Sequence, residues 1–253
     1  MKVTIFKDIK DTSQPFYRDV KLVLKRIEDG SSKDLVKEIR KTKDKEQRNS
    51  LKKRLPAICF SGQFNKRNDN SLLEHSGLIC LDFDGYKSNK DLLQEKEKLS
   101  KNKYIYSVFI SPSGKGLKAL VKIPPNVDNH RNYFNSLKKY FKSDFFDVTS
   151  KNVSRVCYES YDPLIYLSKN SSIWDKIEEQ EYVEKTKYKD KPSIPLTDEN
   201  KIVDILVKWW EKKYGLRDGE RNNNVYILAA AFNDFGVPKT LAEYVMSNLF
   251  GIR

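Results

Sequence analysis

The chain has 253 residues, of which 38% are hydrophobic and 12% aromatic, so a folded core can form and a wholly disordered chain is excluded. Its 48 Lys and Arg residues against 35 Asp and Glu residues give a net charge of +13, which suits a polyanionic partner. No apolar run approaches the ~20 residues that span a bilayer, and we therefore expect a cytoplasmic protein without a membrane partner.

The positive charge is concentrated near the N-terminus. Residues 1–55 carry 17 Lys and Arg against 9 Asp and Glu, which accounts for eight of the thirteen net charges. Two readings stay open for this segment: a solvated helical surface, or a surface that faces nucleic acid.

Hydrophobic periodicity predicts alternating strands and helices along most of the chain. Ser88, with Asp91 three residues later, is a predicted helix N-cap, and Asp128 is predicted to cap a later helix. Strands are expected at 2–6, 56–62, 77–85, 104–111, 117–123 and 153–160, with a tight turn at 111–116. Helices are expected at 17–27, 33–54, 88–101 and 128–141.

This order of elements predicts an α+β fold. We expect a ferredoxin-like or RRM-like mixed sheet with helices on one face, preceded by an N-terminal α/β part. Residues 183–199 are polar, charged and contain proline, which indicates a linker. The expected organisation is a first domain at 1–182, a linker at 183–199 and a small all-helical domain at 200–253.

Cysteine and histidine do not indicate a disulfide or a zinc site. Cys59, Cys80 and Cys157 lie in apolar segments without CxxC spacing and are predicted to be buried free thiols. His75 and His130 form no closely spaced pair, and we expect both to be surface or capping residues.

Two acidic residues end the apolar strand predicted at 77–85. Side chains two residues apart on a strand project to the same face, so Asp82 and Asp84 point one way while Phe83 points into the core. The two carboxylates repel each other unless a cation offsets their charge. The alternative is a strand that simply stops at an Asp-Gly turn.

Asp147 is the candidate third acid, because it precedes the strand predicted at 153–160. Three carboxylates from separate segments can hold two divalent cations, and hard oxygen ligands suit Mg²⁺ or Mn²⁺. Such a site supports in-line phosphoryl transfer. The alternative is that Asp147 caps a turn.

A glycine-containing turn and one arginine are candidate phosphate-binding groups. Glycine lets backbone amides approach phosphate oxygens, and neighbouring lysines can neutralise them, although a plain hairpin with an exposed lysine is an open alternative. Arg155 lies on an apolar predicted strand and needs either a structural carboxylate or a bound triphosphate. The candidates are Ser113, Gly114, Lys115, Gly116, Lys118 and Arg155.

In this order, the motifs resemble the archaeo-eukaryotic primase superfamily, in the primase-polymerase branch of phages and mobile elements. The similarity covers about residues 2–167 and consists of an Asp-x-Asp strand end, a Ser-Gly-x-Gly turn leading to a basic residue, and an aspartate that precedes an arginine. Lys118 stands where the family commonly has histidine. The matching residues are Asp82, Asp84, Ser113, Gly114, Gly116, Asp147 and Arg155.

The resemblance implies a DNA primase-polymerase that uses Mg²⁺ or Mn²⁺ to join NTPs or dNTPs on a single-stranded DNA template. It implies that Asp82, Asp84 and Asp147 are catalytic metal ligands and that the glycine turn, Lys118 and Arg155 bind the nucleotide. It also implies a monomer in a bacterial or phage-infected cytosol, with a replicative helicase as a further partner.

Residues 201 onward resemble the small, PriCT-like helical domain that follows such catalytic cores. Trp209, Trp210 and Tyr214 offer a stacking surface for bases, or alternatively form the core of the helical domain. Contacts to the template or to the first nucleotide are expected from Lys208, Lys212, Lys213, Arg217 and Arg221.

Two other functional classes compete with this interpretation. An RRM-like binding module would bind nucleic acid without catalysis and would stack bases on exposed strand aromatics. A topoisomerase-primase-type (Toprim) enzyme also carries Asp-x-Asp on a strand. It should show a glutamate-bearing strand well before that pair and no glycine hairpin after it.

Overall fold

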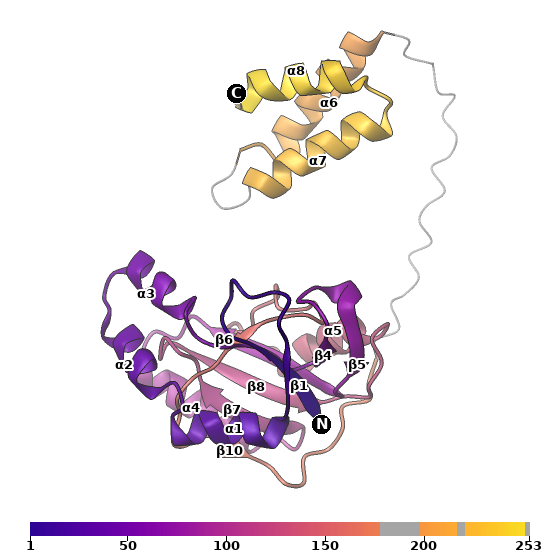
Figure 1. Ribbon diagram of the computed structural model, residues 1–253. Coiled ribbons are helices and arrows are strands. Elements are labelled where there is room, and N and C mark those ends of the chain that lie inside the picture. Colours follow the sequence, from indigo (N-terminus) through magenta and orange to yellow (C-terminus); the bar gives the residue numbers. More distant parts are fainter. Residues whose placement is uncertain (178–197, 217–220, 251–253) are drawn as a thin grey trace. The chain divides into compact units, whose positions relative to one another are not determined.

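The computed structural model describes residues 1–177, 198–216 and 221–250. The chain divides into two compact units, Met1–Glu181 and Tyr182–Arg253, and each has a hydrophobic core of its own (Figure 1). None of the helices in the described ranges is long and apolar enough to cross a membrane. Helices and antiparallel sheets occur together, so the fold class is α+β, as the sequence predicts.

An antiparallel sheet lies at the centre of the first unit. Its strands, with the helix that links the first two, are β6 (Leu78–Asp84), α4 (Asn89–Ser100), β7 (Ile105–Ile110), β8 (Gly116–Lys122) and β10 (Tyr166–Leu167). The order across the sheet is β10-β7-β8-β6. The hairpin strand β8 returns between β6 and β7 and is antiparallel to both. This is a split β-α-β arrangement.

The expectation of a mixed sheet is wrong for the named strand pairs, which are all antiparallel. The parallel strands β6 and β7 are not neighbours, because β8 separates them. On the free edge of β6, Phe83 forms an isolated antiparallel bridge with Phe146. That bridge brings a segment far along the chain to the end of β6.

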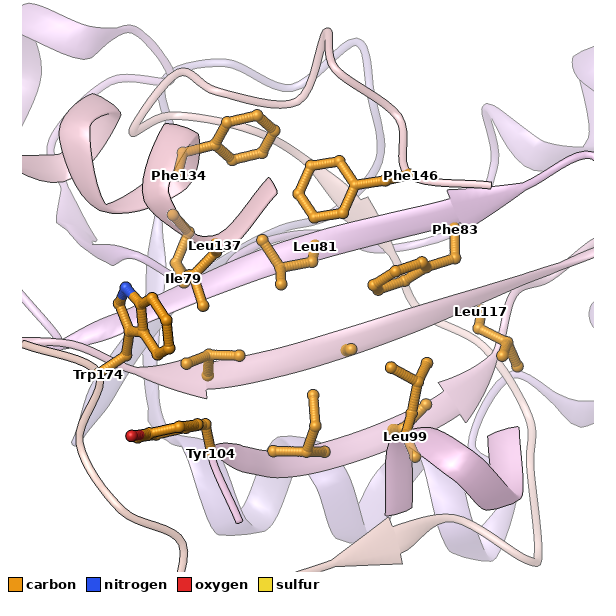
Figure 2. Packing of buried hydrophobic residues seen from close by; sticks show 14 of the residues in the cluster. Ile79, Leu81, Phe83, Leu99, Tyr104, Leu117, Phe134, Leu137, Phe146 and Trp174 are labelled. Carbon is orange, nitrogen blue, oxygen red and sulfur yellow. The ribbon is translucent and has the colours of Figure 1, made fainter. Parts of the chain in front are cut away.

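One face of the central sheet is covered by α4 and α5 (His130–Phe141). Figure 2 shows alternate side chains of β6, Ile79, Leu81 and Phe83, within this cluster. The rings of Phe83 and Phe146 meet edge to face, with centroids 5.3 Å apart. Each large apolar side chain buried in this way contributes about 1.5–3 kcal/mol, so this layer holds β6 rigidly.

The opposite face of the central sheet packs on a second sheet and one helix. The second sheet has the order β2 (Phe16–Asp19), β1 (Lys2–Phe6), β3 (Ala57–Cys59), β9 (Cys157–Tyr158), and the helix is α1 (Val20–Asp29). Leu78 and Cys80 of β6 lie in this second cluster, together with Val23, Leu24 and Ile58. The three cysteines are buried and free, as predicted.

The N-terminal helices differ from their expected bounds. Residues 16–19 form β2, and Asp19 caps α1 by accepting a hydrogen bond from the Lys21 amide at 2.9 Å. The helix expected at 33–54 is two helices, α2 (Lys33–Lys41) and α3 (Lys45–Lys52). Thr42 is extended, and Asp44 starts the second helix by accepting from the Gln47 amide.

Three further expectations have different outcomes. Ser88 caps α4 by accepting a hydrogen bond from the Asp91 amide at 3.1 Å, as predicted. Asp128 does not cap α5, because Asn129 occupies the N-cap position. The strand expected at 153–160 is reduced to β9, because a turn precedes Arg155. A small ribbon of β4 (Gly62–Phe64) and β5 (Leu72–His75), with the 3₁₀ turn η1 (Asp69–Ser71), completes the unit.

The second unit consists of α6 (Glu199–Lys213), α7 (Arg221–Asp234) and α8 (Lys239–Phe250) in its described residues. Trp210 is 3% exposed, and its indole N–H donates to the Asn224 carbonyl at 2.6 Å. Trp209 is 39% exposed. Trp210 therefore belongs to the helical core, while Trp209 faces solvent. Of the linker expected at 183–199, residues 183–197 lie outside the described residues.

Candidate functional site

The two acids at the end of β6 lie on the face predicted for them. Phe83 is fully buried in the helix-covered cluster, so Asp82 and Asp84 face the other way. Asp82 is 2% exposed, whereas Asp84 is exposed at the strand end. Backbone hydrogen bonds from Asp84 to Phe145 (2.7 Å) and from Asp147 to Asp82 (2.9 Å) place Asp147 beside the strand.

Asp82 is held by two cations and a hydroxyl. Its Oδ1 lies 2.6 Å from Nζ of Lys118, which stands opposite Asp82 on β8. Its Oδ2 lies 3.3 Å from Nη2 of Arg155 and accepts a hydrogen bond from Ser150 Oγ at 3.1 Å. The pKa of Lys118 is raised, because the Asp82 carboxylate outweighs the opposing effect of burial.

Asp147 shares two of these partners. Its Oδ2 lies 2.9 Å from Ser150 Oγ and 3.3 Å from Nη2 of Arg155. Its Oδ1 accepts hydrogen bonds from the Thr149 amide and hydroxyl. Burial alone would raise the pKa of Asp147, but these hydrogen bonds and the Arg155 charge lower it overall. Asp82 and Asp147 are therefore joined through Ser150 and Arg155.

Asp84 has a different environment. No hydrogen bond or ion pair joins its carboxylate to another described residue, so nothing offsets its charge directly. Desolvation by the surrounding protein raises its pKa, and the charges of Asp82 and Asp147 add to the rise, while Lys118 and Lys52 oppose it. Asp84 is therefore the one of the three acids without a direct cationic partner among the described residues.

The glycine turn contacts Asp84 closely. A Cβ atom on Gly116 would lie 1.9 Å from Asp84 Oδ1, so only glycine fits there. Gly114 has φ +72°, and its amide donates to the Ser111 carbonyl at 2.9 Å. Ser113 lines the adjoining cavity, whereas Lys115 is exposed and does not. The turn thus places Ser113 and Gly116 at the acids but leaves Lys115 outside.

A cavity of about 190 Å³ joins these groups. Sequence reasoning missed Lys52, which lines the cavity, and Ser150, which contacts Asp82 and Asp147, because neither belongs to a recognisable motif. Lys52 comes from α3, and burial together with the Arg48, Lys118 and Lys115 charges lowers its pKa. The lining residues are Lys52, Asp82, Asp84, Ser111, Pro112, Ser113, Lys118, Arg155, Val156 and Tyr158.

Arg155 reaches the acids from an unexpected position. It lies in an irregular segment before β9 and not on a strand, so the strand predicted for it is wrong. Its side chain is 34% exposed, and its Nε is buried without a hydrogen-bond partner among the described residues. The anionic partner that the sequence required is a carboxylate pair in this structure.

The donor set fits hard divalent cations. In the described parts of the chain, no three His, Cys, Asp or Glu residues already form a metal-binding cluster. The charges of Asp82 and Asp147 nevertheless raise the pKa of Asp84, and Asp84 lines the cavity. Carboxylate oxygens suit Mg²⁺ or Mn²⁺, and these three residues would hold them.

The two histidines are not surface residues, so that expectation is wrong. Nε2 of His75 lies 3.0 Å from Nδ1 of His130, and His130 is 2% exposed. Burial lowers the pKa of His75 to about 4 and that of His130 to about 3. Chain folding brings together two residues that are 55 positions apart.

The expected template residues of the second unit lie on or after α6. Lys208, Lys212 and Lys213 are exposed on this helix. Nζ of Lys213 lies 5.9 Å from the ring centroid of Trp209 and 5.4 Å from that of Tyr214. Arg217 lies outside the described residues, and Arg221 begins α7 with its side chain undescribed.

Residues 50–167 match the family model described as the BT4734-like N-terminal domain. The match spans less than half of the chain, and it contains the three acids, the glycine turn and Arg155. No curated protein and no solved structure matches the chain.

Replacement of the two β6 acids should have opposite effects on stability. Asp82→Asn leaves Lys118 buried without its carboxylate, and we expect a loss of about 3 kcal/mol in unfolding free energy. Asp84→Asn should leave the melting temperature in metal-free buffer unchanged or raised at pH 7, since ionised Asp84 destabilises the fold. Thermal unfolding of both variants in EDTA tests this.

The pH dependence supplies the control. The pKa of Asp84 is raised on folding, so its ionisation costs stability above that pKa and costs nothing below the ordinary aspartate value of 3.8. Any increase in melting temperature that Asp84→Asn gives over the unaltered protein should therefore vanish as the pH falls toward 3.8. Equal destabilisation by both substitutions would contradict the assigned environments.

Proposed function

We propose that the first unit is the catalytic core of a DNA primase-polymerase, which transfers nucleotidyl groups from NTPs or dNTPs on a single-stranded DNA template. The observation that carries the proposal is that Asp82 and Asp84 line one cavity with Lys118 and Arg155, and that Asp147 is paired with Arg155 beside it. The split β-α-β sheet and the order of the three motifs are similar to the archaeo-eukaryotic primase superfamily. Both support this assignment.

Each side chain has a definable task in such a reaction. Asp82, Asp84 and Asp147 would hold Mg²⁺ or Mn²⁺. When bound, these ions lower the pKa of the attacking 3′-hydroxyl and neutralise the triphosphate. Phe83 and the helix-covered layer fix the direction of both β6 carboxylates. Ser150 Oγ lies within hydrogen-bonding distance of both Asp82 and Asp147, and its single hydroxyl proton is shared between the two carboxylates.

The cations retain capacity to contact phosphate. An ammonium group has three N–H donors, and Lys118 uses one on Asp82. Arg155 uses Nη2 on the carboxylates, while its Nε has no partner among the described residues. Lys118 therefore supplies an electrostatic phosphate contact in the place where the family commonly has histidine. Ser113 and the Gly114 and Gly116 backbone shape that side of the cavity.

The layered architecture favours an enzyme over an RRM-like binder. An RRM-like module stacks bases on exposed aromatics of its sheet. Here one face of the central sheet is buried under α4 and α5, and the other is buried under the second sheet and α1. Among the described residues the sheet offers no open aromatic face, whereas the acids open into a cavity.

Primer extension tests the catalytic role of the acids. With Mg²⁺ or Mn²⁺, a primed single-stranded template and dNTPs, the unaltered protein should extend the primer. Asp84→Asn and Asp147→Asn should each lower the rate at least a hundredfold, because metal binding requires their charge. Asp144→Asn is the matched control, since Asp144 lies three residues from Asp147 but is exposed and forms no ion pair with Arg155. Near-normal extension by Asp84→Asn would refute the site.

We propose that the second unit holds the template or the first nucleotide during initiation. Two free nucleotides on a single strand have no duplex to anchor them, and a tethered module supplies contacts at high effective concentration. Trp209 is exposed beside Lys213, Lys212 and Lys208 on α6, which combines a stacking surface with phosphate contacts.

Substitution on α6 separates initiation from extension. Trp209→Ala with Lys212→Ala should lower de novo priming about tenfold while primer extension stays within twofold, because a duplex end needs no extra anchor. The salt dependence of single-strand binding should also become shallower. Tyr244→Ala, an exposed aromatic on α8, is the control. Unaltered priming by the α6 variant would reject this role.

A further inference from the structure

A second cavity of about 370 Å³ lies next to the candidate active site. Arg155, Val156 and Tyr158 line both cavities. The remaining lining residues of the second cavity are Ile9, Arg67, Asn152 and Ser154. Its lining thus carries two guanidinium groups and no carboxylate, whereas the first cavity has two carboxylates beside three cationic side chains.

Arg67 is anchored with part of its charge unsatisfied. Its amide donates to the Thr12 carbonyl at 2.9 Å, and its Nη2 donates to the Ile9 carbonyl at 2.6 Å. Its Nε is buried without a hydrogen-bond partner, and Arg67 forms no ion pair within the described parts of the chain. The Arg67 charge contributes to lowering the pKa of Asp11, so a carboxylate lies within electrostatic range, but the buried Nε donor stays unsatisfied, which is costly.

Arg155 contributes a second unsatisfied donor to the same cavity. Its Nη2 contacts the carboxylates of Asp82 and Asp147, yet its buried Nε has no partner among the described residues. Two arginines from segments 88 positions apart, each with an unpartnered Nε, therefore line one cavity. No hydrogen bond among the described residues satisfies either Nε donor.

The neutral wall of the cavity is already ordered. Asp69 accepts hydrogen bonds from the Ser154 amide at 3.1 Å, from its hydroxyl at 2.6 Å and from Asn152 Nδ2 at 3.4 Å. Asp69 itself does not line the cavity. Its charge is used to fix the 152–154 turn and to pair with Arg131, 3.3 Å away. The cavity is therefore pre-organised, and Asp69 is not paired with Arg67 or Arg155.

We propose that this second cavity is a phosphate-binding subsite, separate from the metal-binding carboxylates and linked to them through Arg155. Planar guanidinium groups with free N–H donors match phosphate oxygens, whereas Asn152 and Ser154 use their donors within the fold and shape the wall. The phosphate belongs to a second nucleotide or to the backbone of a DNA strand. That choice of sources rests on the proposed function, whereas phosphate binding itself does not.

The test uses the full chain and inorganic tripolyphosphate in EDTA, so that no divalent cation contributes. Isothermal titration should show that Arg67→Gln weakens tripolyphosphate binding about tenfold, the loss expected for one charge-assisted contact. Arg67→Lys keeps the charge but loses the planar fork, and it should weaken binding about threefold. Lys66→Gln removes the same charge from the exposed neighbouring residue and should change binding less than twofold.

Two further ligands identify the source of the phosphate. The same variants are titrated with ATP and with a single-stranded oligonucleotide in EDTA. A loss of affinity by Arg67→Gln for ATP alone assigns the subsite to a nucleotide, and a loss for the oligonucleotide alone assigns it to a strand. Melting curves establish that each variant is folded.

Unchanged tripolyphosphate binding by folded Arg67→Gln overturns the proposal. If Arg67→Gln does not fold, the Arg67→Lys variant decides, and unchanged affinity there overturns it equally. Failure of the proposed function gives a different result, because the unaltered protein would then bind tripolyphosphate in an Arg67-dependent way without extending any primer.

Discussion

The candidate site depends on one buried carboxylate. Asp82 is 2% exposed and lies in the layer between two sheets, where an isolated charge would be untenable. Lys118, directly opposite on the neighbouring strand, and Arg155, from a segment 73 positions away, offset that charge. Because these partners come from separate elements, satisfying Asp82 also fixes the register of β6 against β8 and the position of the segment that carries Arg155.

That segment is secured by two more buried acids. Glu159, fully buried, accepts hydrogen bonds from Arg26 at 2.7 and 3.1 Å and another from Ser32. Asp162 pairs with Lys96 at 2.6 Å and accepts from the Ile110 amide at 2.8 Å, at the end of β7. The polypeptide that follows Arg155 is thereby tied to the strand that precedes the glycine turn. Both sides of the candidate active site are held by the same short stretch of chain.

Local patterns predicted much of this correctly, and the failures have physical causes. The β6 strand, its alternation around Phe83 and the Ser88 cap follow from side-chain periodicity and one hydroxyl, which act within a few residues. Arg155 was assigned to a strand because its neighbours are apolar. They are buried because they line the second sheet and its cavities, not because they pair in a long ladder. The contact between His75 and His130 was not predicted, because the two residues are 55 positions apart and only chain packing brings them together.

The sequence by itself determined the α+β class, the pairing of two carboxylates on one strand face and the buried state of the cysteines. These features depend on the alternation of apolar and polar residues along one segment. Only the tertiary structure decided that Ser150 bridges Asp82 and Asp147, that Lys52 reaches the cavity, and that Arg67 and Arg155 border one pocket. Such contacts depend on where distant segments meet, and no local pattern encodes the free energy that brings them together.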